Sequence, residues 1–137
     1  MVALKAWYEH DGPTTVETAA DLDAVLDTLA GWRGRNMVQL VDAADPLRSG
    51  FLDLGIDAVR GVGVACYSGS RTAYWTTNGG TSVADEPPLY YYMGSDTEFP
   101  VDAEIALEDV RKAAHEFMAN GTRPVSVQWA EDQSAHG

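Results

Sequence analysis

Apolar residues recur three and four positions apart in two segments, which is the spacing of a helix with one buried face. These segments are residues 19–31 and 107–118. Thr18 and Asp21 resemble a capping box at the start of the first segment, with Asp in place of the usual Glu or Gln. Asn120-Gly121 is a stop signal after the second segment. The pattern therefore predicts two amphipathic helices.

Apolar and polar residues alternate in most of the remaining segments, which is the period of a strand. Turn-forming residues separate them, and residues 78–87 and 94–102 are predicted as irregular. The strands follow one another along the chain rather than alternating with helices. We therefore predict an α+β fold, a mostly antiparallel sheet of about six to seven strands with two helices packed on one face. The predicted strands are residues 2–8, 37–41, 51–57, 61–67, 71–77, 89–93 and 125–129.

The composition is that of an ordinary globular domain, with 45% hydrophobic and 22% charged residues in a chain of 137. A chain of this length supports one core, so we expect a single domain over residues 1–130 and a polar tail over residues 131–137. The N-terminus has no basic segment followed by a long apolar run, and no apolar stretch approaches the roughly 20 residues of a membrane span. We therefore expect no membrane partner and a cytoplasmic location.

The chain is strongly acidic, with 21 acidic and 9 basic residues and a formal net charge of −12. This charge repels phosphate, and no basic patch is present, which argues against direct nucleic-acid binding and favours a basic macromolecular partner. Residues 72–110 contain eight acidic residues and no Lys or Arg, so they account for −8 of the −12. A solubilising acidic face with the nearby aromatic residues in the core would produce the same composition.

No catalytic, metal-binding or cofactor-binding motif emerges from the sequence. Cys66 is the only cysteine, which excludes an intrachain disulfide and a Cys-rich zinc site, and we expect it to be a small buried residue. His115-Glu116 resembles the start of a zinc-binding motif, but Ala119 stands where the second His is needed. We expect no catalytic residue, no metal and no cofactor. A small carboxylate-based enzyme, with or without a divalent metal, is the alternative, because pairs of acidic residues cannot be recognised in a sequence this acidic.

The acidic segment is also rich in aromatic residues, and this combination suits a surface that binds a basic protein. Aromatic side chains anchor protein interfaces, and acidic side chains attract a basic partner over longer distances. Because side chains alternate along a strand, Tyr91 cannot share a face with Tyr90 and Tyr92. Glu98 is the best single candidate, although a carboxylate that caps its own loop is equally consistent. The predicted partner-binding residues are Trp75, Asp85, Glu86, Tyr90, Tyr92, Asp96, Glu98, Phe99 and Asp102.

Residues 89–129 carry a diffuse set of matches to a known family, through Tyr91, Glu98, Phe99, Pro100, Arg111 and Trp129. In these residues the chain resembles the first-numbered immunity-protein family of bacterial polymorphic toxin systems. The resemblance implies an α+β inhibitor, encoded beside a toxin, that binds the toxin's C-terminal domain. Toxins paired with this family are often nucleic-acid deaminases.

Together, the charge pattern and the resemblance lead us to expect an immunity protein rather than an enzyme. It would inhibit a cognate toxin by covering the toxin's basic substrate site with an acidic and aromatic surface. An interaction module unrelated to toxins is a third reading.

Overall fold

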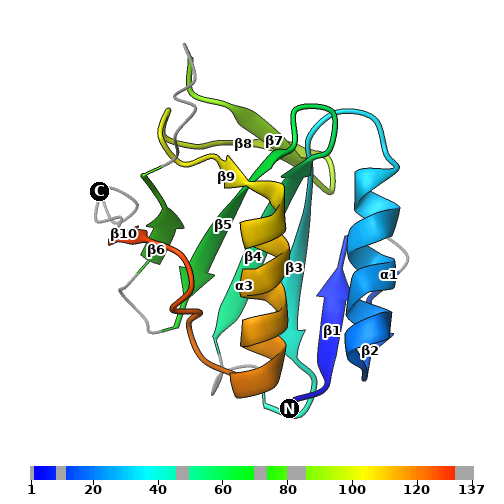
Figure 1. The fold of residues 1–137 in the computed structure, drawn as a ribbon. Coiled ribbons are helices and arrows are strands. Elements are labelled where there is room, and N and C mark those ends of the chain that lie inside the picture. Colours follow the sequence, from blue (N-terminus) through cyan, green and yellow to red (C-terminus); the bar gives the residue numbers. More distant parts are fainter. Residues whose placement is uncertain (1, 9–11, 46–49, 70–73, 80–85, 132–137) are drawn as a thin grey trace.

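The computed structural model describes residues 2–8, 12–45, 50–69, 74–79 and 86–131. Within them it contains ten strands and two helices (Figure 1). The helices are α1 (Ala19–Ala30) and α3 (Leu107–Asn120). The strands are β1 (Leu4–Trp7), β2 (Thr14–Val16), β3 (Asn36–Asp42), β4 (Phe51–Asp57), β5 (Val62–Ser68), β6 (Tyr74–Thr77), β7 (Leu89–Tyr92), β8 (Ser95–Glu98), β9 (Ile105–Ala106) and β10 (Trp129–Glu131).

The sheet is mostly antiparallel, with the main strand order β10-β6-β5-β4-β3-β1-β2. Strand β7 joins β3 through one parallel pair, Asn36 with Tyr91, and pairs antiparallel with β8, while β9 pairs with β5. The predicted α+β class and mostly antiparallel sheet are confirmed. The described residues form ten strands rather than six to seven.

Three short strands were not predicted because they carry no alternating pattern. Strands β2 and β9 have only three and two residues, and β8 consists of four exposed polar residues. The predicted last strand was misplaced, because pairing with β6 begins only at Trp129. Val125 is 83% exposed, and the Glu116 carboxylate accepts the backbone N–H groups of Val125 and Ser126 at 2.6 and 3.1 Å. These hydrogen bonds hold the segment before β10 in a conformation outside the sheet.

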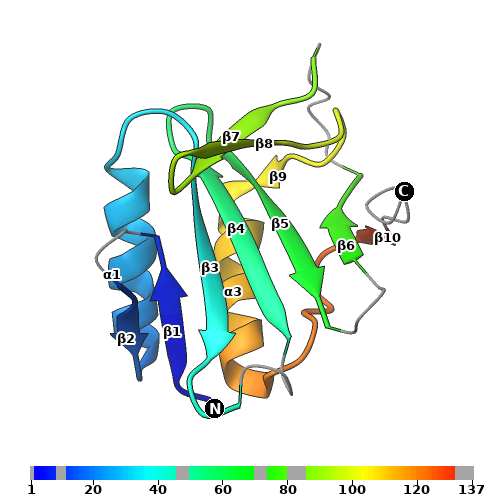
Figure 2. The ribbon, with the colours of Figure 1, turned by 180° about the vertical axis from the view of Figure 1, so that it is seen from behind.

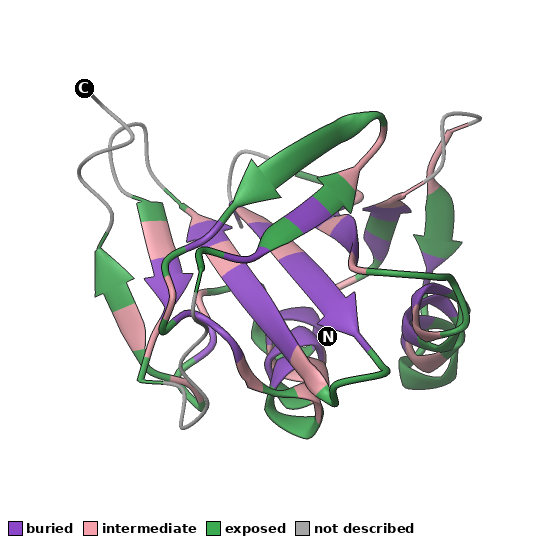
Figure 3. Cartoon of the chain, turned by 90° about the horizontal axis from the view of Figure 1, so that it is seen from above, coloured by how far each residue is buried: buried purple, intermediate pink, exposed green. Residues whose placement is uncertain are grey.

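Both helices cover the same face of the sheet (Figures 2 and 3). The predicted capping box is confirmed: Thr18 Oγ1 accepts the Asp21 N–H at 3.1 Å, and the Asp21 carboxylate accepts the Thr18 N–H at 3.2 Å. Helix α3 ends at Gly121, whose φ of 67° is the left-handed conformation that glycine adopts without strain. The apolar faces of the two helices meet the sheet through Leu22, Val25, Leu26, Leu29, Val110, Ala114, Phe117 and Met118.

The hairpin of β7 and β8 lies on the opposite face of the sheet from the helices (Figure 3). It covers a second, smaller core made of Met37, Val64, Tyr90, Phe99 and Ala103. Gly55 in β4 makes this close approach possible, because a Cβ atom there would lie only 2.5 Å from Cδ2 of Tyr90. The two faces of the sheet are thus covered by elements of different size and chemistry.

Candidate functional site

The outer surface of the β7–β8 hairpin combines exposed apolar and acidic side chains. Leu89 pairs with Glu98 and Tyr91 pairs with Asp96, and residues directly opposite in an antiparallel pair share one face. Leu89 and Tyr91 are 48% and 46% exposed, and both carboxylates are exposed as well. We call these four residues the hairpin face. It brings together Asp96 and Glu98, two of the predicted binding residues.

The inner surface of the hairpin faces the sheet. Tyr90 is fully buried, and its ring packs edge-to-face against Phe99, with ring centroids 5.6 Å apart. Phe99 is only 3% exposed. Tyr90 and Phe99 were predicted as contact residues, but in this structure they are core residues that hold the hairpin against the sheet. Tyr92 is half-buried beside the same small core.

A buried polar network anchors the hairpin from below. The Tyr90 hydroxyl donates a hydrogen bond of 2.6 Å to Glu104, which is 1% exposed. The Glu104 carboxylate also accepts hydrogen bonds from both terminal nitrogens of Arg60. Asp57 in turn pairs with Arg60 at 3.5 Å and with Arg35 at 3.2 Å. Burial raises the pKa of Tyr90, and the hydrogen bond to Glu104 raises it further. The charge of Glu104 is therefore neutralised by an arginine outside the acidic segment.

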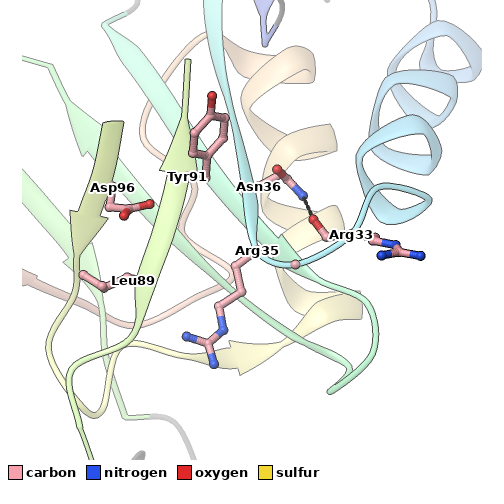
Figure 4. A pocket seen from close by; sticks show the side chains of 7 residues that line it. Arg33, Arg35, Asn36, Leu89, Tyr91 and Asp96 are labelled. Atoms are coloured by element: carbon pink, nitrogen blue, oxygen red, sulfur yellow. Dashed lines mark hydrogen bonds between the residues drawn. The ribbon is translucent and has the colours of Figure 1, made fainter. Parts of the chain in front are cut away.

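An open groove of about 570 Å³ separates the hairpin from the loop that precedes β3. Figure 4 shows Leu89, Tyr91 and Asp96 on the hairpin side of this groove, opposite Arg33 and Arg35. The Tyr91 N–H donates to the Arg35 carbonyl oxygen at 2.8 Å, which ties the two sides together. Figure 4 shows the Arg33 side chain pointing away from the hairpin, and Arg35 pairs with Asp57 at 3.2 Å, so the groove has one acidic wall, and its arginines are directed elsewhere.

A comparison with protein families matches residues 10–131 to the model described as Immunity protein Imm1. The chain belongs to the Imm1 immunity-protein family. The match confirms the resemblance seen in residues 89–129 and extends it through most of the N-terminal half. Membership supports an immunity-protein role and implies a cognate toxin as partner. A comparison with curated proteins gave no match.

The other predicted binding residues of this Imm1 family member are dispersed. Trp75 lies on the helix side of the sheet, half-buried against the larger core, with the guanidinium carbon of Arg123 3.9 Å from the centre of its ring. Glu86 and Asp102 are exposed in the segments that precede β7 and follow β8. Asp85 lies outside the described residues. The structure therefore does not bring Trp75 to the hairpin face.

Leu89 and Tyr91 are the surface residues that the sequence prediction missed. Alternation showed that Tyr91 faces away from Tyr90 and Tyr92, but both sides of the strand are aromatic, so the pattern did not reveal which side meets solvent. Arg33 is a second omission, because it reaches the groove from a loop far away in the sequence.

Nothing in the described part of this Imm1 family member resembles a metal centre, since no three His, Cys, Asp or Glu side chains there lie close enough to hold one ion. His115, the residue considered for a zinc motif, instead places Nε2 2.7 Å from Asp23 Oδ1 and so links the two helices. Neither helix of the described chain has the length and apolar content of a membrane span.

Proposed function

We propose that the hairpin face is the surface with which this immunity protein binds its cognate toxin. The observation that carries the proposal is the exposure of two cross-strand pairs, Leu89 with Glu98 and Tyr91 with Asp96, on one side of a projecting hairpin. Half-exposed Leu and Tyr side chains gain stabilisation when a partner covers them, and Tyr is enriched among the residues that dominate binding energy.

The acidic side chains of the same surface have a different role in this proposal. Asp96 and Glu98 are exposed, so water weakens their contribution to the bound complex, while their charge accelerates the encounter with a basic protein in a salt-dependent way. The net charge of −12 adds long-range attraction for such a partner. The aromatic and aliphatic residues would therefore set how long the complex lasts, and the carboxylates how fast it forms.

The partner that suits this surface is a toxin acting on nucleic acid, and we propose a nucleic-acid deaminase. An enzyme of this kind needs a positively charged groove for its substrate. A hairpin that carries carboxylates and a tyrosine can occupy that groove and exclude the substrate without doing chemistry itself. The family membership supports the toxin partner, and the local negative charge supports a basic site on it.

The direct test is to purify the protein encoded beside this chain and assay its deaminase activity on DNA and RNA oligonucleotides. We expect one equivalent of the immunity protein to abolish the activity. A neighbour that is no toxin, or a toxin that stays active at equimolar inhibitor, would overturn the proposed function. A toxin that is inhibited but does not deaminate either nucleic acid would remove only the deaminase assignment.

The hairpin face is tested by charge reversal. Replacing Asp96→Lys together with Glu98→Lys should weaken toxin binding about 10- to 100-fold, mainly through slower association, and flatten its salt dependence. The matched control is Glu17→Lys with Glu108→Lys, two exposed acids on the helix side. Each double variant changes the formal net charge from −12 to −8, a difference of +4. Equal affinities for the two double variants would exclude the hairpin face from the interface.

A truncation separates the apolar contribution from the charge. Tyr91→Ala should weaken binding about 30-fold through faster dissociation, with the association rate and its salt dependence unchanged. Tyr74→Ala is the control, because Tyr74 is also a strand tyrosine, 42% exposed, but lies on β6.

A further inference from the structure

A small pocket lies between the inner surface of the hairpin and the sheet. Its volume is about 90 Å³, so it has room for a single small group. Thr97 is exposed, which places the β8 side of the pocket at the protein surface. Strands β3, β4 and β5 contribute one lining residue each, and the hairpin and the residue directly after it contribute the others. The lining residues are Met37, Asp53, Cys66, Tyr92, Thr97 and Phe99. We call this the Asp53 pocket.

The carboxylate of Asp53 is incompletely hydrogen-bonded. Asp53 lies in the middle of β4, between Gln39 on β3 and Cys66 on β5. Gln39 hydrogen-bonds the carboxylate, yet Asp53 Oδ1 is shielded from solvent and has no hydrogen-bond partner among the described residues. A buried acceptor without a donor is rare in native proteins and is unfavourable for folding.

No cation within the described chain compensates this carboxylate. The described arginines that form ion pairs do so elsewhere: Arg35 and Arg60 with Asp57, Arg60 with Glu104, and Arg111 with Asp23 and Asp27. Burial raises the pKa of Asp53 to about 6, so the group is still mostly ionised at pH 7. Burial raises the pKa of Tyr92, and the negative charge of Asp53 raises it further. The pocket therefore borders a carboxylate whose shielded Oδ1 lacks a donor among the described residues.

We propose that the Asp53 pocket receives the ammonium group of a lysine side chain from the toxin, and that a rotation of the Asp53 side chain turns the shielded Oδ1 toward it. An ammonium is a compact donor that can satisfy a single free oxygen, whereas a guanidinium binds best to two parallel carboxylate oxygens, of which Gln39 already engages one side. The rings of Tyr92 and Phe99 line the same space and favour a cation through their π-electrons. Thr97 can supply a second acceptor at the mouth.

This inference rests on the proposed function for the identity of the donor, but the pocket can be tested without a toxin. The free, ¹⁵N-labelled protein is titrated with n-butylammonium chloride at constant ionic strength, and amide chemical shifts are followed by NMR. We expect saturable shifts in the millimolar range at residues around the pocket, above all Asp53, Cys66 and Thr97. The variant D53N should lose these shifts, and the control D96N, which removes a carboxylate from the hairpin face, should keep them.

Several outcomes would overturn the proposal. These are the absence of saturable shifts, equal shifts in D53N, or binding of methylguanidinium at least as tight as that of butylammonium. A pocket that only holds water gives the first of these results. Tight binding of Mg²⁺, Mn²⁺ or Ca²⁺ that D53N abolishes would assign the pocket to a metal instead.

The complex with the toxin gives the second test. D53N should bind the toxin about 10-fold more weakly than the unmodified protein, as expected for loss of a charged hydrogen bond, and circular dichroism should show that it is folded. If the unmodified protein binds the toxin and D53N binds equally well, the pocket proposal fails and the proposed function stands. If the unmodified protein does not bind, the proposed function fails, and the ammonium titration still decides whether the pocket binds a cation.

Discussion

The two faces of the central sheet are built on different principles. On the helix face, α1 and α3 cover a continuous apolar cluster in which side chains such as Leu40, Leu54 and Phe117 are fully buried. On the side of the sheet that the hairpin covers, a smaller core is mixed with acidic residues: buried Glu104 in its network with Tyr90 and Arg60, and half-buried Asp53, whose shielded Oδ1 lacks a donor among the described residues. We infer that the helix side contributes most of the folding stability. The hairpin side is less stabilising, and we propose that it carries the surface for a partner.

The largest change in stability should come from truncating a core side chain on the helix side of the sheet. Phe117→Ala removes a fully buried ring and leaves a cavity under the sheet, so the free energy of unfolding should fall by about 3–5 kcal/mol. Chemical denaturation measures this change. Toxin affinity, determined at a temperature where the variant is folded, should stay within about twofold of the unmodified value. A large loss of affinity in the folded variant would show that the two faces are not separable.

Asp53→Asn is expected to raise the free energy of unfolding rather than lower it. Because the pKa of Asp53 is raised from 3.8 to about 6 in the fold, the folded state holds the proton more tightly than the unfolded state, and stability declines as pH rises from about 4 through 6. The variant lacks this penalty, so at pH 8 it should be more stable by about 2–3 kcal/mol, with the gain disappearing below pH 4. Denaturant midpoints across this pH range test the prediction. A gain that does not depend on pH would rule out the carboxylate charge as its cause.

A smaller loss of stability is expected when the buried hydrogen bond between the hairpin and Glu104 is removed. Tyr90→Phe deletes the hydroxyl that donates to Glu104 and leaves a buried carboxylate with one donor fewer, so stability should fall by about 1–2 kcal/mol. Tyr91→Phe is the matched control, since the neighbouring hydroxyl belongs to an exposed side chain and its loss should change stability by less than about 0.5 kcal/mol. Equal effects in the two variants would contradict the anchoring role of the network.

The smallest effect concerns the contact between the two helices. The hydrogen bond from His115 is the main cause that lowers the pKa of Asp23. The stabilisation is therefore present above the ordinary pKa of 3.8 and is lost as pH falls through the lower folded value. Because Asp23 is 48% exposed, Asp23→Asn should cost less than about 1 kcal/mol at pH 7. Thermal unfolding at pH 7 and pH 3 should show a larger difference at pH 7, and a difference of equal size at both would contradict this assignment.

Local periodicity was sufficient for the long elements on the helix side. Residues 51–57 were predicted and are observed as β4, and the capping box of α1 follows from Thr18 and Asp21, three residues apart. In these segments the apolar side chains repeat with the period of the element, so their spacing indicates which face is buried.

The hairpin side depends on contacts between distant residues, and local patterns failed there. Strand β8 has no apolar residue to reveal its period and forms only because β7 pairs with it. Asp53 resembles an ordinary polar strand residue in the sequence, and it becomes half-buried where Tyr92 and Phe99, some 40 residues further along the chain, line the same pocket. The charge count identified an acidic segment, but it could not distinguish buried Glu104 from exposed Glu98.

Strand β8 pairs only with β7, so one of its sides is a sheet edge within the described fold. Edges of this kind recruit further strands, and many β-proteins aggregate through them. Here Asp96 and Glu98 stand on every second residue of the edge strand. A second copy pairing at the same edge would bring its own two carboxylates against them, and like charges on neighbouring strands repel. We therefore expect the residues proposed to attract a basic toxin also to disfavour edge-to-edge pairing between copies of the protein.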